Sequence, residues 1–194
     1  MSTGKTKGVV FVGVGGQGIL LASTITARAA MLAGFEVKTN EVHGMAQRGG
    51  SVIAHVRYGA EVFSPTVPEG TADALGALEE IEALRYAHYA APTGLAVVSA
   101  TAVVPVTVSS GSATYPEDVA ERLRRAFPRL VYFDAGERAA ALGNIRAANI
   151  VLLGTLSLGL DLPQEAWAEA ITRSVKDKQR DLNLRAFEIG RTIR

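Results

Sequence analysis

A glycine-rich turn near the amino terminus constrains the fold of this chain more than any other feature. The apolar run Gly8–Val12 leads into Gly13-x-Gly15-x-x-Gly18, and an amphipathic segment follows to Ala33, where Gly34 supplies a natural helix end. Strand, tight glycine turn and helix in this order are typical of dinucleotide-binding α/β folds. There the first glycine permits the turn, the second lets a ligand approach the backbone, and the third lets the helix pack closely on the strand.

The rest of the chain predicts one α/β domain over residues 1–194, built as a Rossmann-like three-layer sandwich. We expect a mostly parallel sheet and a helical C-terminal third. Further strands are expected at 35–42, 51–58, 95–99, 103–108 and 130–133, with a loop at 59–70. Further helices are expected at 73–89, 116–127, about 137–160, 164–175 and 177–191.

Composition excludes several classes of function. The chain has 20 basic and 19 acidic residues, and this balance argues against a nucleic-acid or acidic-membrane partner. It has no cysteine, so it can supply no thiolate to an iron–sulfur cluster and no thiol nucleophile. Its three histidines are widely spaced, so no dedicated metal site is expected. No targeting or spanning segment is evident, and we expect a soluble cytoplasmic protein.

A second group of special residues follows the second expected strand. The loop after Glu41 brings His43, Gln47 and Arg48 together with Gly49 and Gly50. Loops at the carboxyl ends of parallel strands surround the ligand crevice, so we expect this loop beside the glycine turn at one rim of the sheet. The histidine could transfer a proton, and the arginine could bind a phosphate or carboxylate. The alternative is a solvated turn in which Arg48 pairs with a local acid.

The glycine turn on its own leaves its ligand open. An NAD site needs an acid at the end of the second strand to bind the ribose. Glu41 is the available candidate, about 23 residues after Gly18. Gln17 adds an amide that an ordinary dinucleotide turn does not need. A structural alternative is that the glycines only let the first helix pack tightly on the sheet.

Two segments together carry a resemblance to a known family. They read Val-Gly-Val-Gly-Gly-Gln-Gly-Ile-Leu at 12–20 and Glu-Val-His-Gly-Met-Ala-Gln-Arg-Gly-Gly-Ser-Val at 41–52. This pair resembles the gamma-type subunits of 2-oxoacid:ferredoxin oxidoreductases, and the second segment most resembles the small subunit of the indolepyruvate type. Gly70-Thr-Ala-Asp73 and Gly143-Asn-Ile-Arg-Ala-Ala-Asn149 are also similar to the family, and the likeness covers about residues 8–190.

The resemblance implies an accessory subunit of an enzyme that oxidatively decarboxylates an aryl 2-oxoacid to an acyl-CoA. Thiamine diphosphate, Mg and iron–sulfur clusters would be carried by a large catalytic partner, which passes electrons to ferredoxin; coenzyme A would be the acyl acceptor. This chain alone is not expected to be active or to hold a cofactor, and it has no obvious thiamine diphosphate signature. Under this interpretation, the candidate cofactor-facing residues are Gly13, Gly15, Gly16, Gln17 and Gly18, and the candidate interface or active-site rim is His43, Gln47, Arg48, Gly49 and Gly50.

Two other functions remain open from the residues themselves. One is a stand-alone NAD(P)-dependent oxidoreductase, supported by the glycine turn and Glu41. The other is a non-catalytic assembly partner whose rim binds no small molecule. Asn144, Arg146 and Asn149 fit helix capping and a solvated stripe, with a hydrogen-bonded subunit contact as the alternative.

Overall fold

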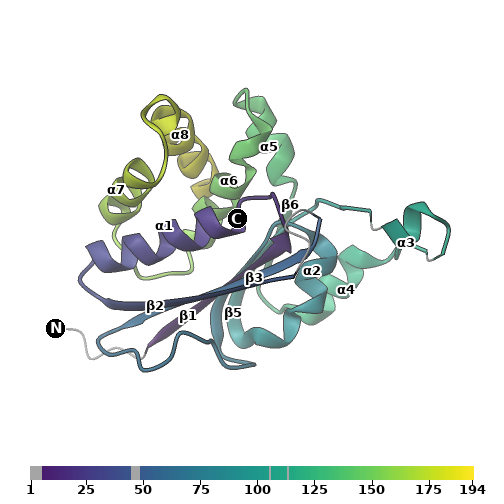
Figure 1. The fold of residues 1–194 in the computed structure, drawn as a ribbon, viewed down its shortest axis with the longest axis horizontal. Helices are drawn as coiled ribbons and strands as arrows, with labels where there is room; N and C mark the ends of the chain where they lie inside the picture. Colours follow the sequence, from purple (N-terminus) through teal and green to yellow (C-terminus); the bar gives the residue numbers. More distant parts are fainter. Residues whose placement is uncertain (1–5, 45–48, 105, 113) are drawn as a thin grey trace.

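A six-stranded sheet forms the centre of the molecule (Figure 1). The computed structural model describes residues 6–44, 49–104, 106–112 and 114–194. The strands lie in the order β2-β3-β1-β4-β5-β6. Their bounds are β1 (Lys7–Val14), β2 (Glu36–His43), β3 (Ser51–Gly59), β4 (Ala72–Ala77), β5 (Ala90–Ser99) and β6 (Leu130–Phe133).

Helices cover both faces of the sheet, which gives the three expected layers (Figure 1). One face carries α1 (Ile19–Leu32), α5 (Ala135–Ala141), α6 (Ala148–Ser157), α7 (Gln164–Ser174) and α8 (Arg180–Arg191). The other carries α2 (Glu80–Arg85) and α4 (Val119–Ala126), while the short α3 (Val106–Ser109) projects from the body. Short 3-10 turns are η1 (Ala87–Tyr89), η2 (Ile145–Ala147) and η3 (Asp177–Gln179).

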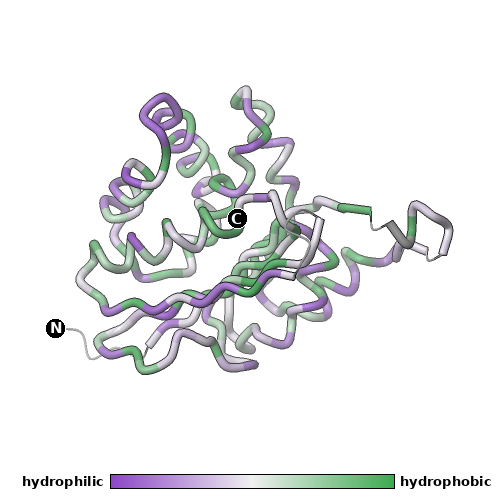
Figure 2. The backbone as a smooth tube through the Cα atoms, in the orientation of Figure 1, coloured by the Kyte–Doolittle hydropathy of each residue, from purple (hydrophilic) through white to green (hydrophobic). Residues whose placement is uncertain are grey.

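Two buried apolar clusters, one on each face of the sheet, hold these layers together. Val9 and Phe11 of β1 belong to the cluster under α1 and α6, whereas Val10 and Val12 belong to the cluster under α2 and α4. A central strand that is buried on both faces accounts for the apolar run in the sequence. Hydrophilic residues, in contrast, gather away from the sheet, around the connection between α7 and α8 (Figure 2).

The sheet is mixed, with its parallel part at one side. β1, β4, β5 and β6 run parallel to one another. β3 pairs antiparallel with both β1 and β2, so the β2–β3 hairpin places β3 between the first two strands of the chain. The expected Rossmann-like fold with a helical C-terminal third is therefore confirmed, and the hairpin is its departure from an all-parallel sheet.

The prediction of a helix at 73–89 is wrong over its first half, where the structure has strand β4. This strand lies between β1 and β5, so both of its faces are buried and it shows no alternation of polar and apolar residues. Leu75, Leu78 and Ile81 follow one another at intervals of three, a spacing that imitates a helix across the junction between β4 and α2.

Two further boundaries also differ from expectation. The strand expected at 103–108 is absent from the described residues there, which instead contain α3. The single helix expected at about 137–160 is divided into α5, η2 and α6. Gly143 lies between α5 and η2 with φ of 94°, a left-handed conformation that ends a helix. The stop at Gly34 is confirmed, because Phe35 N–H bonds the Ala30 carbonyl at 3.1 Å beyond the end of α1.

Candidate functional site

The glycine turn joins β1 to α1 at the edge of the sheet where the parallel strands end. Gly16 and Gly18 adopt positive φ angles of 104° and 86°, so both positions favour glycine for conformational reasons. Gly18 also lies against α6. A Cβ added to it would be 2.5 Å from Asn149 Nδ2, which donates a hydrogen bond to the Gly18 carbonyl at 3.2 Å.

The other glycines of the turn divide into packed and open positions. A Cβ on Gly13 would be 2.7 Å from Gln17 Oε1 and 2.8 Å from Ile19 Cδ1. A Cβ on Gly16 would meet nothing within 4 Å. Gly13 and Gly18 therefore serve close packing, while Gly16 presents bare backbone to its surroundings.

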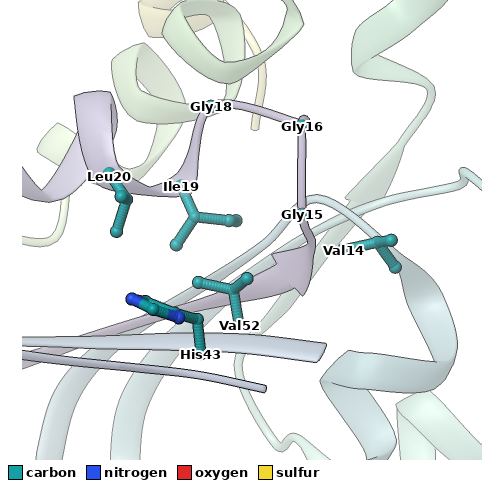
Figure 3. Close-up of a pocket in the computed structure, with 8 residues that line it drawn as sticks. All are labelled: Val14, Gly15, Gly16, Gly18, Ile19, Leu20, His43 and Val52. Atoms are coloured by element: carbon teal, nitrogen blue, oxygen red, sulfur yellow. The ribbon is translucent and has the colours of Figure 1, made fainter. Parts of the chain in front are cut away.

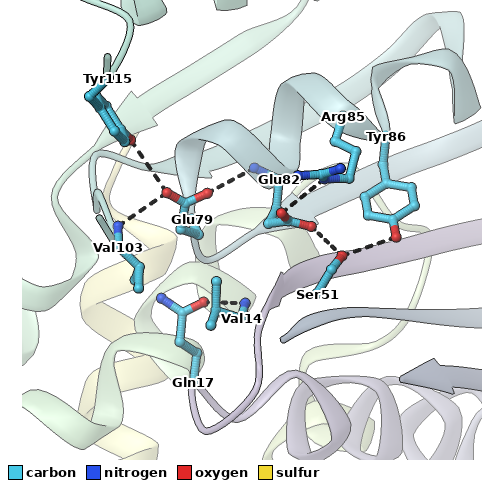
Figure 4. A network of polar contacts seen from close by, with 9 residues as sticks. All are labelled: Val14, Gln17, Ser51, Glu79, Glu82, Arg85, Tyr86, Val103 and Tyr115. Carbon is cyan, nitrogen blue, oxygen red and sulfur yellow. Dashed lines mark hydrogen bonds and ion pairs between the residues drawn. The ribbon is translucent and has the colours of Figure 1, made fainter. Parts of the chain in front are cut away.

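Gln17 uses both ends of its amide to fix the turn. Its Oε1 accepts a hydrogen bond from Val14 N–H at 2.7 Å (Figure 4), and its Nε2 donates to the Leu78 carbonyl at 3.0 Å. The side chain thus spans from β1 to the end of β4. In open α/β folds, ligands bind at the point where the crossover helices change face of the sheet. Here that point lies between β1 and β4, because α1 and α2 cover opposite faces.

Gly49 and Gly50, at the end of the β2–β3 loop, lie beside the glycine turn, as the sequence predicted. Gly15 N–H donates to the Gly50 carbonyl at 2.8 Å, and Gly49 N–H donates to the Gly15 carbonyl at 3.4 Å. His43 ends β2 and faces the first turn of α1 across a cavity of about 450 Å³ (Figure 3). The cavity is lined by Val14, Gly15, Gly16, Gly18, Ile19, Leu20, His43 and Val52. Gln47 and Arg48 lie outside the described residues.

Glu41 is not positioned as the ribose partner of a dinucleotide at the glycine turn. The strand next to β1 on that side is the antiparallel β3, and β2 lies beyond it. Glu41 instead accepts a hydrogen bond from the Ser23 hydroxyl of α1 at 3.3 Å. Glu41 therefore does not supply the ribose-binding acid that an NAD(P) site at this turn would need.

A second hollow lies on the other side of the glycine turn, at the ends of β4, β5 and β6. Its volume is about 670 Å³, and Gly16 and Gly18 line both hollows. Its charged and amide side chains are Gln17, Asp134, Glu137, Arg146 and Asn149. Small residues, among them Ala100, Ala102, Gly136 and Ala148, form much of the remaining wall.

The asparagines expected as caps have separate roles. Asn144 caps η2, because its Oδ1 accepts from Arg146 N–H at 3.1 Å. Asn149 is not on a solvated stripe; it is buried and bonds Gly18. It is thus one of the residues that fix the glycine turn. No local sequence pattern predicts this contact, because the two residues are far apart along the chain.

Three buried glutamates at the start of α2 were missed by the sequence analysis. Glu79 accepts hydrogen bonds from Glu82 N–H at 2.8 Å and Val103 N–H at 3.2 Å, and Tyr115 hydroxyl lies 3.4 Å away (Figure 4). Glu80 accepts from the hydroxyls of Tyr115 at 3.0 Å and Tyr132 at 2.6 Å. All three carboxylates are almost fully buried.

Glu82 extends this polar network to the start of β3. It accepts a hydrogen bond from the Ser51 hydroxyl, which also contacts the Tyr86 hydroxyl at 3.0 Å. Arg85 forms an ion pair with Glu82 at 3.0 Å. With Gln17 bound to Leu78, the β4–α2 junction therefore contacts the glycine turn, the start of β3, and Val103 and Tyr115 of segment 101–115.

Burial shifts the pKa values of two groups in this network. It raises the pKa of Glu79, while hydrogen bonds from backbone N–H groups oppose the rise. Burial and the neighbouring Glu80 raise the pKa of Tyr132 to about 12. Among the described residues, no group of three or more histidine, aspartate or glutamate side chains is placed to bind a metal ion. Nor is any helix in the described ranges long and apolar enough to cross a membrane.

Comparison with solved structures supports the fold. The keto/oxoacid ferredoxin oxidoreductase gamma subunit of Geobacter sulfurreducens matches with a TM-score of 0.70 and 25% identity, and the match covers 95% of each chain. A pyruvate oxidoreductase subunit from Thermotoga maritima matches with a TM-score of 0.72 at 21% identity, over 98% of this chain and 97% of that one.

Sequence comparison identifies the family. This chain is 45% identical over 191 residues to the indolepyruvate oxidoreductase subunit IorB of Thermococcus kodakarensis, covering 96% of this chain and 95% of that protein. The subunit of the same name from Archaeoglobus fulgidus is 46% identical over 186 residues, covering 94% and 92%. The family model described as pyruvate ferredoxin/flavodoxin oxidoreductase matches residues 8–193. The chain therefore belongs to the pyruvate ferredoxin/flavodoxin oxidoreductase family.

Proposed function

We propose that this chain is the small accessory subunit of a 2-oxoacid:ferredoxin oxidoreductase of the indolepyruvate type. The observation that carries the proposal is the identity of about 45% over almost the full length of relatives bearing that name. The complex would oxidatively decarboxylate an aryl 2-oxoacid, transfer the acyl group to coenzyme A and pass electrons to ferredoxin. We place it in the cytoplasm as part of the same proposal.

In this proposal the redox cofactors belong to a large catalytic partner. The chain contains no cysteine, so it does not fit an iron–sulfur cluster held by thiolates. The described residues also provide no cluster of acidic or histidine ligands for a metal. Thiamine diphosphate, Mg and the clusters are therefore assigned to the partner, and this chain acts as a single domain that completes the complex.

The rim formed by the glycine turn and the β2–β3 loop is the proposed contact with that partner. Gly16 offers open backbone between two hollows, and His43 lines one of them. We extend the contact to Gln47, Arg48, Gly49 and Gly50. Bare amides and an arginine at such a rim suit a phosphate or carboxylate, so the approach of coenzyme A is assigned to the same edge, with the turn Gly13–Gly18 facing it.

Reconstitution with the large subunit tests the assignment of function. The isolated chain should not oxidise 2-oxoacids. Co-purified with its proposed large catalytic partner, the chain should give coenzyme A-dependent oxidation of indolepyruvate with an artificial electron acceptor. Reduction of NAD by the isolated chain would contradict the proposal. Stable association that leaves turnover unchanged would instead favour a purely structural partner.

Arg48→Ala tests the rim separately. We expect weaker assembly, or a KM for coenzyme A raised about tenfold, because a charge-assisted contact contributes about 1.5–3 kcal/mol. Arg173→Ala, which removes an exposed ion pair with Glu169 on α7, is the matched control. Unchanged assembly and unchanged kinetics in Arg48→Ala would exclude the rim while leaving the function intact.

A further inference from the structure

The outer strand β6 leaves one edge of the sheet open. Within the described part of the chain it pairs with β5 alone. Ala96 N–H donates to the Arg129 carbonyl and Ala100 N–H to the Phe133 carbonyl, both at 2.8 Å. Backbone groups alternate in direction along a strand, so those of Leu130 and Tyr132 point away from the sheet. Such groups form a template for a further strand.

A hollow of about 540 Å³ runs along this edge and has an arginine on each side of it. Arg124, on α4, lies on the face of Phe127, and Arg194, after α8, lies on the face of Ile193. The rest of the lining is Pro128, Leu130, Val131, Tyr132 and Phe133. The hollow therefore offers apolar contact along the strand and positive charge on both faces.

Within the described residues, these two arginines differ from their neighbours because neither forms an ion pair. Arg122 pairs with Asp118 at 2.8 Å, and Arg125 pairs with Glu121. Among the described residues no ion pair involves Arg124 or Arg194, although both side chains are exposed. Their positive charge is thus available to a ligand at the edge.

The opposite edge of the sheet is built differently. On β2, Glu36 and Lys38 form an ion pair at 3.4 Å, so both signs of charge are present along that strand. Mixed charge on an edge strand discourages pairing with other chains. At the β6 edge, Asp134 follows the strand, but the charged side chains that line the hollow are both arginines, Arg124 and Arg194. The hollow itself therefore favours an acidic partner.

We propose that the β6 edge binds an extended acidic segment of another protein, which adds to the sheet as a seventh strand. Main-chain hydrogen bonds to Leu130 and Tyr132 would supply affinity. Side chains alternate between faces of a strand, so two acids one or three positions apart would reach Arg124 on one face and Arg194 on the other. A second copy of this chain fits poorly, because joining two β6 edges brings four arginines together. The inference does not depend on the proposed reaction.

A peptide titration with the full chain tests this proposal. The probe is a fluorescently labelled peptide of about eight residues, with two adjacent glutamates in a valine and threonine background. We expect saturable binding, and slower hydrogen exchange at the amides of Leu130 and Tyr132 when the peptide is present. Arg124→Glu and, independently, Arg194→Glu should each weaken binding about tenfold.

Arg125→Glu is the matched control, since it makes the same charge change on the same helix but away from the hollow. It should change the dissociation constant by less than about twofold. Equal weakening by the variants at positions 124 and 125, equal binding of a peptide with lysines in place of glutamates, or unprotected Leu130 and Tyr132 amides would each overturn the proposal. A dimer of the chain alone in which these amides are protected would assign the edge to a second copy.

Discussion

The glycine turn and the start of α2 lie at the ends of neighbouring strands, yet they are held in place by opposite means. The turn owes its shape to missing side chains, since Gly13 and Gly18 leave room for Gln17 and Asn149 to approach. The start of α2 owes its shape to charged side chains that are buried and hydrogen-bonded, above all Glu79. The Gln17–Leu78 hydrogen bond joins the two regions.

This difference has consequences for how each region tolerates change. Close packing fails when atoms are added, because the neighbours are backbone or buried side chains that can move little. A buried polar network fails when atoms are removed, because a donor that loses its acceptor is left without a partner in the protein interior. The same edge of the sheet should therefore respond oppositely to enlarging and to truncating substitutions.

The largest effect is expected from enlarging the packed glycine of the turn. Gly18→Ala places a Cβ 2.5 Å from Asn149 Nδ2 and forces alanine to a φ of 86°. Left-handed strain and overpacking together should lower the free energy of unfolding by about 2–4 kcal/mol. Urea unfolding of the purified chain measures this.

Two further variants separate the effect of left-handed backbone strain from the effect of overpacking. Gly16→Ala shares the positive φ but has open space around it, so it should lose only about 1–2 kcal/mol. Adding Asn149→Ala to Gly18→Ala should recover part of the stability, because it removes the side chain with which the new Cβ clashes. Equal losses in Gly16→Ala and Gly18→Ala would show that packing against α6 is unimportant.

A smaller effect is expected from truncating the buried network. Glu79→Ala leaves Glu82 N–H and Val103 N–H without their acceptor, at a cost of about 1–3 kcal/mol. Hydrogen exchange of these two amides should become faster, and Glu79→Gln should restore part of the protection because it keeps an acceptor oxygen. If Glu79→Ala unfolds like the wild type with unchanged exchange, the carboxylate does not hold segment 101–115.

The two regions also differ in how far the sequence predicted them. The glycine turn was predictable, because its spacing is local and the conformations that it needs are specific to glycine. The position of the β2–β3 loop beside it followed from the same reasoning, and the Gly15–Gly50 contact confirms it. The proposed binding roles of these residues stay predictions.

The buried glutamates could not be predicted in this way, because their partners are distant in sequence. Tyr132 and Glu80 meet only once β6 has joined the sheet beside β5. The strand β4 was hidden for a related reason: with both faces buried it has no polar face to reveal its period. Local sequence patterns thus predict glycine turns and amphipathic helices. Contacts between distant segments can be predicted only when the order of the strands in the sheet is known.

The smallest effect concerns the pH dependence of stability, which should be present in the network and absent from the turn. The Glu79 carboxyl lies near Glu82 and the Tyr115 hydroxyl, and burial raises its pKa above the ordinary value of 4.5. A pKa raised by folding means that the folded state binds the proton more tightly than the unfolded state. The resulting stabilisation is complete below pH 4.5 and is lost as pH rises through the pKa of the folded state.

The stability of the wild type relative to Glu79→Gln should therefore fall as pH rises from 4.5 toward neutrality, as measured by urea unfolding at each pH. Glu117→Gln, which removes the same charge from an exposed position, serves as the control. Parallel curves for the wild type and Glu79→Gln would contradict the argument.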